Sequence, residues 1–262
     1  MPIPLFHVDA FTAAPFAGNP AAVCPLSHWL DDELLRSVAA ENNLSETAYF
    51  LPRGENYEIR WFTPRCEAKL CGHATLASAF VIMEILEPGR ESVRFETRFS
   101  GPLSVRRERD LLAMDFPALP PWPCEGPPSA LLEGLGKNPA AVVQIEDNYF
   151  VVYEHEQDVR AIRPDLRLLE KLHPAGVAIT APGYDSDFVS RYFAPSYGIP
   201  EDPVTGSTHC SLAPYWAERL GKSTLHARQV SERGGEVWCE LNGQRVILKG
   251  RAVLTLRGEL LI

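Results

Sequence analysis

The sequence predicts an α+β protein built from two similar halves, and three features of the chain support this. Arg60–Ala79 reads as an aromatic strand ending at a proline, a polar loop, and a glycine that opens an alanine-rich helix. Residues 191–213 repeat this order of strand, loop and glycine-opened helix. A proline-rich segment at 116–128 separates the halves, because proline is excluded from helix interiors and from central strands.

The first half reads as short strands with two helices among them. Apolar residues recur at helical spacing from Leu30 to Ala39 behind two aspartates, which predicts a helix that ends just before Leu44. The alanine-rich run predicts a second helix over about 74–86. Apolar runs and alternating patterns predict strands at Phe6–Phe11, Ala21–Cys24, Leu44–Leu51, Tyr57–Phe62, Ser92–Thr97, Leu103–Glu108 and Leu111–Phe116.

The second half has a parallel pattern. Helices are expected at Ser129–Leu135, at about 166–172 and after Gly206. Strands are expected at Ala140–Glu146, Tyr149–Glu154, Gly176–Thr180, Phe188–Phe193, His226–Ser231, Glu236–Leu241, Gln244–Lys249 and Arg251–Arg257. We place the boundary at about Pro117, which gives domains 1–117 and 118–262, with the alternative that the last strand packs back on the first domain.

Composition and charge restrict the class of partner. The chain has 262 residues, of which 45% are hydrophobic and 23% charged, as in ordinary globular proteins. A net charge of −9 without a long Lys/Arg run argues against nucleic acid. No apolar run is long enough to span a membrane, and the first residues lack the basic region of a signal peptide. We therefore expect a cytoplasmic protein with a small-molecule partner, and a homodimer and a monomer both remain open.

The six cysteines do not predict a disulfide framework or a metal site. None lies in a C-x-x-C pair. Cys24, Cys124 and Cys239 are most simply small buried residues. Cys66, Cys71 and Cys210 could be drawn into a zinc cluster with His73 and His209, but the paired ligand spacing of structural zinc sites is missing. We expect no metal and no organic cofactor.

The two glycine-opened helices offer the best candidate site. Gly72 precedes His73, and Gly206 precedes Ser207. Free backbone N–H groups at a helix start favour a carboxylate or a developing oxyanion, and glycine allows close approach. Alternatively, Ser207 or Thr208 is an ordinary helix cap and Gly72 forms only a tight turn. Because two matched helix starts carry different polar residues, we favour the functional interpretation.

For the other polar residues near these helices, a structural interpretation stands beside the functional one. Glu46 lies between apolar neighbours where a helix hands over to a strand, so it either faces water or is an inward carboxyl suited to proton transfer. Periodicity alone does not choose between these. Asp202 precedes a proline in what is usually a solvated turn, and a lone helical histidine such as His209 is more often structural.

Four ordered motifs resemble those of the phenazine biosynthesis PhzF-like proteins. They are D-A-F with G-N-P-A-A-V near the start, N-L-S-E-T at 43–47, F-T-P with C-G-H-A-T at 62–75, and E-D-P-V-T-G-S at 201–207. The resemblance covers nearly the whole chain. It implies the diaminopimelate epimerase-like fold, which the proline racemases share: two facing domains, each a strand-rich roll around a central helix, with the active site in the cleft between them.

The resemblance also implies roles for individual residues. In the isomerase of this family, the glutamate of N-L-S-E moves a proton between carbons of a small cyclic amino acid without metal or cofactor, and this role falls on Glu46. His73, Asp202 and Ser207 correspond to residues that help to hold the substrate. Gly72 and Gly206 would supply backbone donors. The phenazine enzyme has a different residue where this chain has Cys71, so the phenazine substrate itself is not implied.

Three functions remain open from the sequence. The first is a cofactor-independent isomerase that uses Glu46 as acid and base on a small carboxylate-bearing substrate. The second is a racemase or epimerase that uses Cys71 as one base, although the second helix start has no matching cysteine. The third is a non-catalytic module that binds a small molecule or a protein and has no need of a proton-transferring Glu46.

Overall fold

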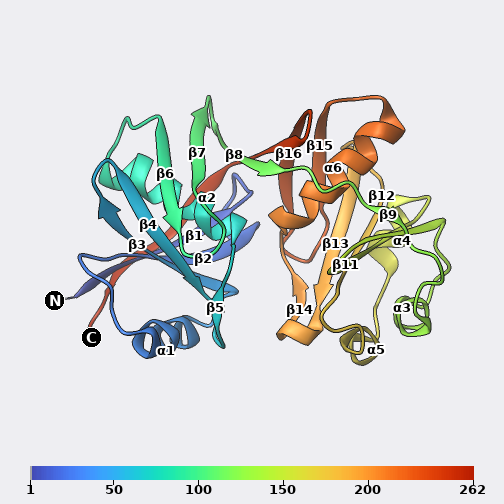
Figure 1. Ribbon diagram of the computed structural model, residues 1–262, viewed down its shortest axis with the longest axis horizontal. Coiled ribbons are helices and arrows are strands. Elements are labelled where there is room, and N and C mark those ends of the chain that lie inside the picture. Colours follow the sequence, from blue (N-terminus) through green and yellow to red (C-terminus); the bar gives the residue numbers. More distant parts are fainter. Residues whose placement is uncertain (1) are drawn as a thin grey trace. The chain divides into compact units, whose positions relative to one another are not determined.

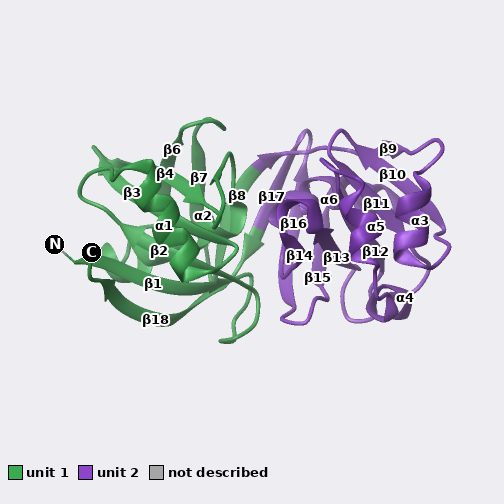
Figure 2. Cartoon of the chain, turned by 90° about the horizontal axis from the view of Figure 1, so that it is seen from below, with its two compact units in different colours: residues 1–115, 249–262 green, residues 116–248 purple. Residues whose placement is uncertain are grey.

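The computed structural model describes residues 2–262, and the chain divides into two compact units. Unit 1 comprises Met1–Asp115 and Lys249–Ile262, and unit 2 comprises Phe116–Leu248 (Figure 2). The chain therefore leaves unit 1 after Asp115 and returns to it at Lys249. Residues 249–262 differ from the simple division at 118–262, because the last strand pairs along the first strand of unit 1.

Unit 1 consists of short strands around one buried helix (Figure 1). Its strands are β1 (Ile3–Ala10), β2 (Asn19–Pro25), β3 (Glu46–Arg53), β4 (Asn56–Phe62), β5 (Glu67–Ala68), β6 (Ser92–Thr97), β7 (Leu103–Glu108), most of β8 (Leu111–Pro117), and β18 (Ala252–Leu260). Its helices are α1 (Asp32–Asn42), α2 (Gly72–Val81) and the π-helical turn η1 (Ile82–Leu86).

Unit 2 contains a similar set of elements. Its strands are β9 (Trp122–Pro123), β10 (Ala141–Ile145), β11 (Asn148–Val152), β12 (Gly176–Pro182), β13 (Phe188–Ala194), β14 (Ile199–Asp202), β15 (Thr224–Gln229), β16 (Gly235–Asn242) and most of β17 (Arg245–Gly250). Its helices are α3 (Ser129–Leu135), α4 (Glu156–Ala161), α5 (Leu166–Glu170), the short η2 (Pro195–Tyr197) and α6 (Gly206–Leu220).

The strand pairings of the two units follow the same order. In unit 1, the pairs β1–β2, β2–β3, β3–β4, β4–β6 and β6–β7 alternate between antiparallel and parallel, beginning antiparallel. In unit 2, the pairs β10–β11, β11–β12, β12–β13, β13–β15 and β15–β16 alternate in the same way. A further strand pairs with the first strand of each set, β18 with β1 and β9 with β10. The repeated motif in the sequence thus reflects a repeated topology.

The central helix of unit 1 is α2. It packs against β1, β2, β3, β7 and β18, and eight of its ten residues are buried. A helix with mostly small and apolar residues on all its faces is suited to a buried position. Its buried hydroxyls are satisfied within the helix, since Thr75 donates to the carbonyl of Cys71 and Ser78 to that of Ala74. The structure starts α2 at Gly72, before the predicted residue 74, and its last turn is π-helical.

The corresponding helix of unit 2 is α6. It packs against β15 and β16, and its Trp216 stacks on Phe188 of β13 and donates to Thr180 of β12. The helix ends at Gly221, whose φ of 62° lies in the left-handed region that terminates helices. The central helices α2 and α6 thus both begin at a glycine, Gly72 and Gly206.

Outer helices cover a second hydrophobic core in each unit. In unit 1, Leu35 and Val38 of α1 pack with Tyr49 and Phe62 of β3 and β4. In unit 2, the helices α3, α4 and α5 pack over β11, β12 and β13. The sequence did not predict α4, a six-residue helix in which Val159 is the one buried hydrophobic side chain. It also did not predict β9, which lies in the proline-rich segment and pairs with β10 over two residues.

No helix within residues 2–262 is long and apolar enough to cross a membrane.

Candidate active site

Three polar side chains of unit 1 meet at the start of α2. Glu46 is the first residue of β3, Cys71 is the N-cap of α2, and His73 is its second helical residue. The parallel pairing of β2 with β3 places Glu46 opposite Ala21, within the strands that surround the helix. The tight spacing of Cys71, Gly72 and His73 brings the thiol and the imidazole to the same helix end. Two segments that lie far apart in the sequence thus supply one cluster.

The cluster is compact and largely shielded from solvent. His73 Nε2 lies 3.4 Å from Glu46 Oε2, with the side chains 7% and 14% exposed. Cys71 Sγ lies 3.5 Å from His73 Nδ1. One oxygen of Glu46, the sulfur of Cys71 and one ring nitrogen of His73 all lie within 4.8 Å of one another. Glu46 is therefore neither a solvated surface residue nor fully buried.

Burial determines the charge of the imidazole in this cluster. Loss of solvation lowers the pKa of His73 to about 3, so the ring is neutral near pH 7. The contact with Glu46 therefore joins a carboxyl group to a neutral imidazole. In a neutral ring one nitrogen donates and the other accepts, and each ring nitrogen lies near one polar partner: Nδ1 near the Cys71 thiol and Nε2 near the Glu46 carboxyl group. A neutral His73 can orient the carboxyl group without competing with it for protons.

A second polar cluster lies at the start of α6 in unit 2. Asp202 ends β14, Thr205 is the N-cap of α6, and Gln229 ends β15. Thr205 Oγ1 donates to Asp202 Oδ2 at 2.5 Å. Gln229 accepts from the backbone N–H of Thr205 at 2.9 Å and donates to the carbonyl of Asp202 at 2.7 Å. Gln229 is 1% exposed. It is therefore a buried side chain whose hydrogen bonds hold the loop before α6 in place.

The remaining predicted residues of unit 2 differ in exposure. Gly206, the first residue of α6, is buried, whereas Ser207 is exposed. His209 is fully buried and its Nδ1 lies 2.8 Å from the carbonyl of Thr205. Desolvation lowers the pKa of His209 to about 4. His209 therefore has the position of a structural residue.

Both central helices begin without a side-chain cap. The N-cap residues Cys71 and Thr205 make no capping hydrogen bond to the first helical turn in the described chain. Thr208, considered from the sequence as a cap, instead donates to the carbonyl of Thr205. The first N–H groups of a helix lack intrahelical partners, and such groups favour anions. Gly72 and Gly206 are the first residues of these two helix starts.

An arginine–glutamate pair holds the segment before each helix start. Arg60 donates to both carboxylate oxygens of Glu67 at 2.7 and 2.8 Å, and its guanidinium lies 5.0 Å from the ring centroid of Phe62. We call this pair the unit 1 clamp. Two charge-assisted bonds in a fork geometry fix both position and direction.

The unit 2 clamp repeats this arrangement with Arg191 and Glu201. Its two bonds measure 2.8 and 2.9 Å, and Arg191 lies 4.9 Å from the ring centroid of Phe193. Glu67 precedes Gly72 by five residues, and Glu201 precedes Gly206 by five.

Some of these residues were not identified from the sequence. The arginines of the clamps stand in the repeated R-W-F and R-Y-F motifs, so the repeat itself was the available signal. Thr205 lies within the T-G-S motif but was given no role. Gln229 has no local signal, because it reaches the site through the parallel pairing of β13 with β15.

The chain matches the family model for phenazine biosynthesis-like proteins (PhzC-PhzF) over residues 8–258. It is 53% identical to an uncharacterized isomerase of Pseudomonas aeruginosa, with 99% of both chains covered. A crystal structure of a PhzF family protein from Enterococcus faecalis has a TM-score of 0.95 and 42% identity, covering 100% of both chains. A probable proline racemase from Agrobacterium radiobacter has a TM-score of 0.61 at 12% identity, covering 98% of this chain and 92% of that one, which shows a shared fold alone.

These similarities and the repeated topology define an isomerase with the diaminopimelate epimerase-like fold. Within that class, the chain belongs to the phenazine biosynthesis-like (PhzF) family. The fold class and the family resemblance predicted from the sequence motifs are thus confirmed.

Proposed function

We propose that this protein is a cofactor-independent isomerase that moves a proton between two carbons of a small carboxylate-bearing substrate. Glu46 is the proton carrier. The observation that carries the proposal is the position of Glu46, which begins β3 beside the start of α2, is 14% exposed and lies 3.4 Å from a buried neutral imidazole. General acid and base groups of this kind contribute a factor of about 10² to 10⁴ in rate.

In the proposed reaction, ionised Glu46 removes a proton from one carbon as the C–H bond breaks. The electron pair left on the substrate is delocalised toward its unsaturated or carboxylate-bearing part, and protonated Glu46 then returns the proton to a second carbon. His73 orients Glu46 by hydrogen bonding. The N–H groups behind Gly72 and Gly206 are suited to a carboxylate or a developing oxyanion. Asp202 and Ser207, near the start of α6, are proposed to bind polar groups of a substrate.

The alternative of a two-base racemase depends on Cys71, which contacts His73 at the helix start. Such a mechanism needs a second base. The cysteine of α6 is Cys210, in the second turn of that helix, where burial raises the pKa of its thiol to about 12. This thiol is protonated near neutral pH and is a poor base. We therefore prefer Glu46 as the proton carrier.

The test measures proton transfer at carbon directly, so it works whichever product the enzyme forms. The protein is incubated in D2O with a panel of small cyclic and acyclic amino acids and related carboxylates, and carbon-bound deuterium is followed by NMR and mass spectrometry. Glu46→Gln is expected to lower the exchange rate by at least about 10² while the circular dichroism spectrum stays unchanged. The matched control is Glu96→Gln, which removes a carboxylate from β6 of the same unit.

Exchange that persists in folded Glu46→Gln would remove Glu46 as the proton carrier. Tight binding of a panel member without any exchange would instead support the non-catalytic binding module.

A further inference from the structure

We propose that Glu46, Cys71 and His73 also form a binding site for Zn²⁺ or a similar thiophilic divalent cation. The three side chains offer a carboxylate, a thiolate and an imidazole, which are the ligand types that zinc takes in proteins. The spacing of cysteines and histidines in the sequence does not show that β3 brings the carboxylate of Glu46 to the Cys71–His73 pair.

Two of the three distances between the ligand atoms are close to those around one zinc ion, and the third pair, Glu46 and Cys71, lies within 4.8 Å. Around a tetrahedral zinc ion with ligand bonds of about 2.0 to 2.3 Å, donor atoms lie roughly 3.3 to 3.6 Å apart. His73 Nε2 lies 3.4 Å from Glu46 Oε2 and 4.0 Å from Cys71 Sγ. The first distance needs no change. The second needs a movement of a few tenths of an ångström, which a small rotation of the cysteine side chain supplies.

The local structure holds these donors in place. Cys71 and His73 belong to the start of a buried helix, where Thr75 Oγ1 donates to the carbonyl of Cys71 at 2.6 Å. Glu46 precedes Thr47, which is 1% exposed and accepts from Asn42 at the end of α1. A site whose ligands stand on rigid elements is held close to its binding geometry before the ion arrives.

Three protein ligands leave one coordination position of a tetrahedral ion for water or a ligand carboxylate. Structural zinc sites, by contrast, are closed by four protein ligands. The bound ion would coordinate the Glu46 carboxylate, so that this group could no longer accept a proton from the substrate. The cation is therefore expected to inhibit the isomerase, a consequence that rests on the proposed function, whereas the metal site itself does not.

The experiment titrates the full-length, untagged protein with Co²⁺, which reports on its ligands by absorption. One equivalent is expected to produce a thiolate-to-cobalt charge-transfer band and the visible bands of four-coordinate cobalt, and Zn²⁺ should displace it. Cys71→Ser should abolish the charge-transfer band. His73→Asn and Glu46→Gln should weaken cobalt affinity by at least about 10-fold, because loss of even an outer supporting group has effects of that size.

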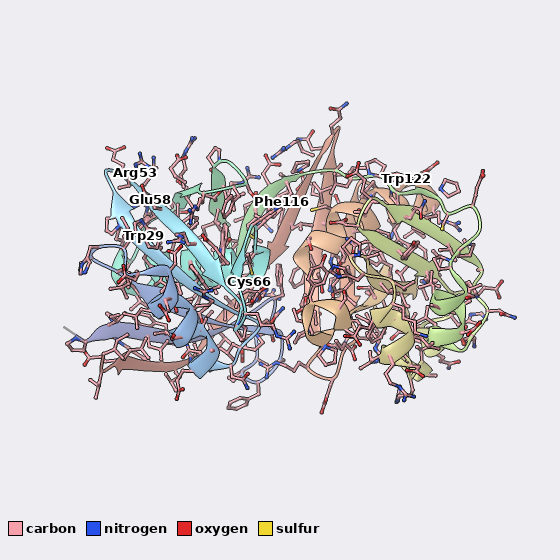
Figure 3. The ribbon with its side chains drawn as sticks, turned by 60° about the horizontal axis from the view of Figure 1, so that its bottom comes forward. Trp29, Arg53, Glu58, Cys66, Phe116 and Trp122 are labelled. Atoms are coloured by element: carbon pink, nitrogen blue, oxygen red, sulfur yellow. The ribbon has the colours of Figure 1, made fainter. Side chains whose placement is uncertain are left out.

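Cys66→Ser is the matched control, since Cys66 is exposed on the loop before β5 (Figure 3). It should bind Co²⁺ like the wild type. Lack of a thiolate band in the wild type, or a band that persists in folded Cys71→Ser, would overturn the proposal. Because the readout is metal binding, it is independent of whether the deuterium exchange test succeeds.

Discussion

Cys71 separates the two enzymatic hypotheses at the scale of a single residue. Cys71 is 6% exposed, and its thiol lies 3.5 Å from the imidazole of His73. In the proposed isomerase it fills space beside His73, whereas in a racemase it would be a base.

We expect Cys71→Ala to retain most of the deuterium exchange activity. Removal of one sulfur atom from a buried position should lower the free energy of unfolding by about 1 kcal/mol. The measurements are exchange rates by NMR and urea unfolding by circular dichroism, with exposed Cys66→Ala as the control. Complete loss of exchange in a folded Cys71→Ala protein would favour the racemase and contradict the role given to Glu46.

The site residues differ in how far the sequence could predict them. Glu46 and His73 each belong to a short contiguous motif. Gly72 and Gly206 mark helix starts that can be recognised from their immediate neighbours in the sequence. Gln229 could not be found in this way. Its amide binds the loop before α6 only because β15 pairs with β13, and a single sequence contains no record of such a long-range contact.

At the scale of the elements, the two clamps connect each β-hairpin to the helix that follows. Arg60 also pairs with Asp32 of α1 at 2.8 Å, and Arg191 donates to the carbonyls of Val159 and Ile162 at the end of α4. Each arginine thus holds a hairpin, an outer helix and the segment that leads to a central helix. The side chains of Arg60 and Arg191 are 11% and 9% exposed. Their positive charges are therefore stabilised mainly by these protein partners and little by water.

We expect Arg60→Met to lower the free energy of unfolding by about 3 kcal/mol, because it leaves the carboxylate of Glu67 partly buried and unpaired. Amide hydrogen exchange at the start of α2 should also become faster. The matched control is Arg53→Met in the same hairpin, where Arg53 is 65% exposed and pairs with Glu58 (Figure 3). Surface pairs contribute about 0 to 1 kcal/mol, so equal effects of the two variants would contradict the proposed role of the clamp.

Most elements were predictable because their physical signals are local. Short apolar and alternating runs predicted the longer strands, and the alanine-rich run predicted α2. The helix α4 was missed because its six residues include one buried hydrophobic side chain, too few to define a period. Its Glu156 is held by tertiary contacts instead, accepting from the backbone of Tyr184.

At the scale of the whole molecule, each unit contains one buried histidine in its central helix. Desolvation lowers the pKa of His73 to about 3 and that of His209 to about 4. In the unfolded chain an imidazole titrates near its ordinary pKa of about 6.5. Because the folded-state pKa is the lower one, the stability contributed by a neutral ring is fully present above pH 6.5 and is lost as the pH falls toward 3 to 4.

We therefore expect the free energy of unfolding to fall between pH 7 and pH 5, by about 2 kcal/mol for each of these histidines. Urea unfolding at the two pH values measures the loss. His209→Asn should reduce it, since the remaining group does not titrate in this range, while His28→Asn on an exposed loop should not. An unchanged loss in His209→Asn would contradict the assignment.

Strand β18 makes the order of synthesis matter for this protein. It pairs with β1 along Ile3–Ala10, yet it is made after all of unit 2. A ribosome adds about 5 to 20 residues per second, so β1 waits roughly 10 to 50 s for its partner. Residues 116–248, by contrast, emerge as one continuous segment. The later-translated unit can therefore close first, and the nascent N-terminal segment must keep an unpaired strand edge from associating with neighbouring chains in the meantime.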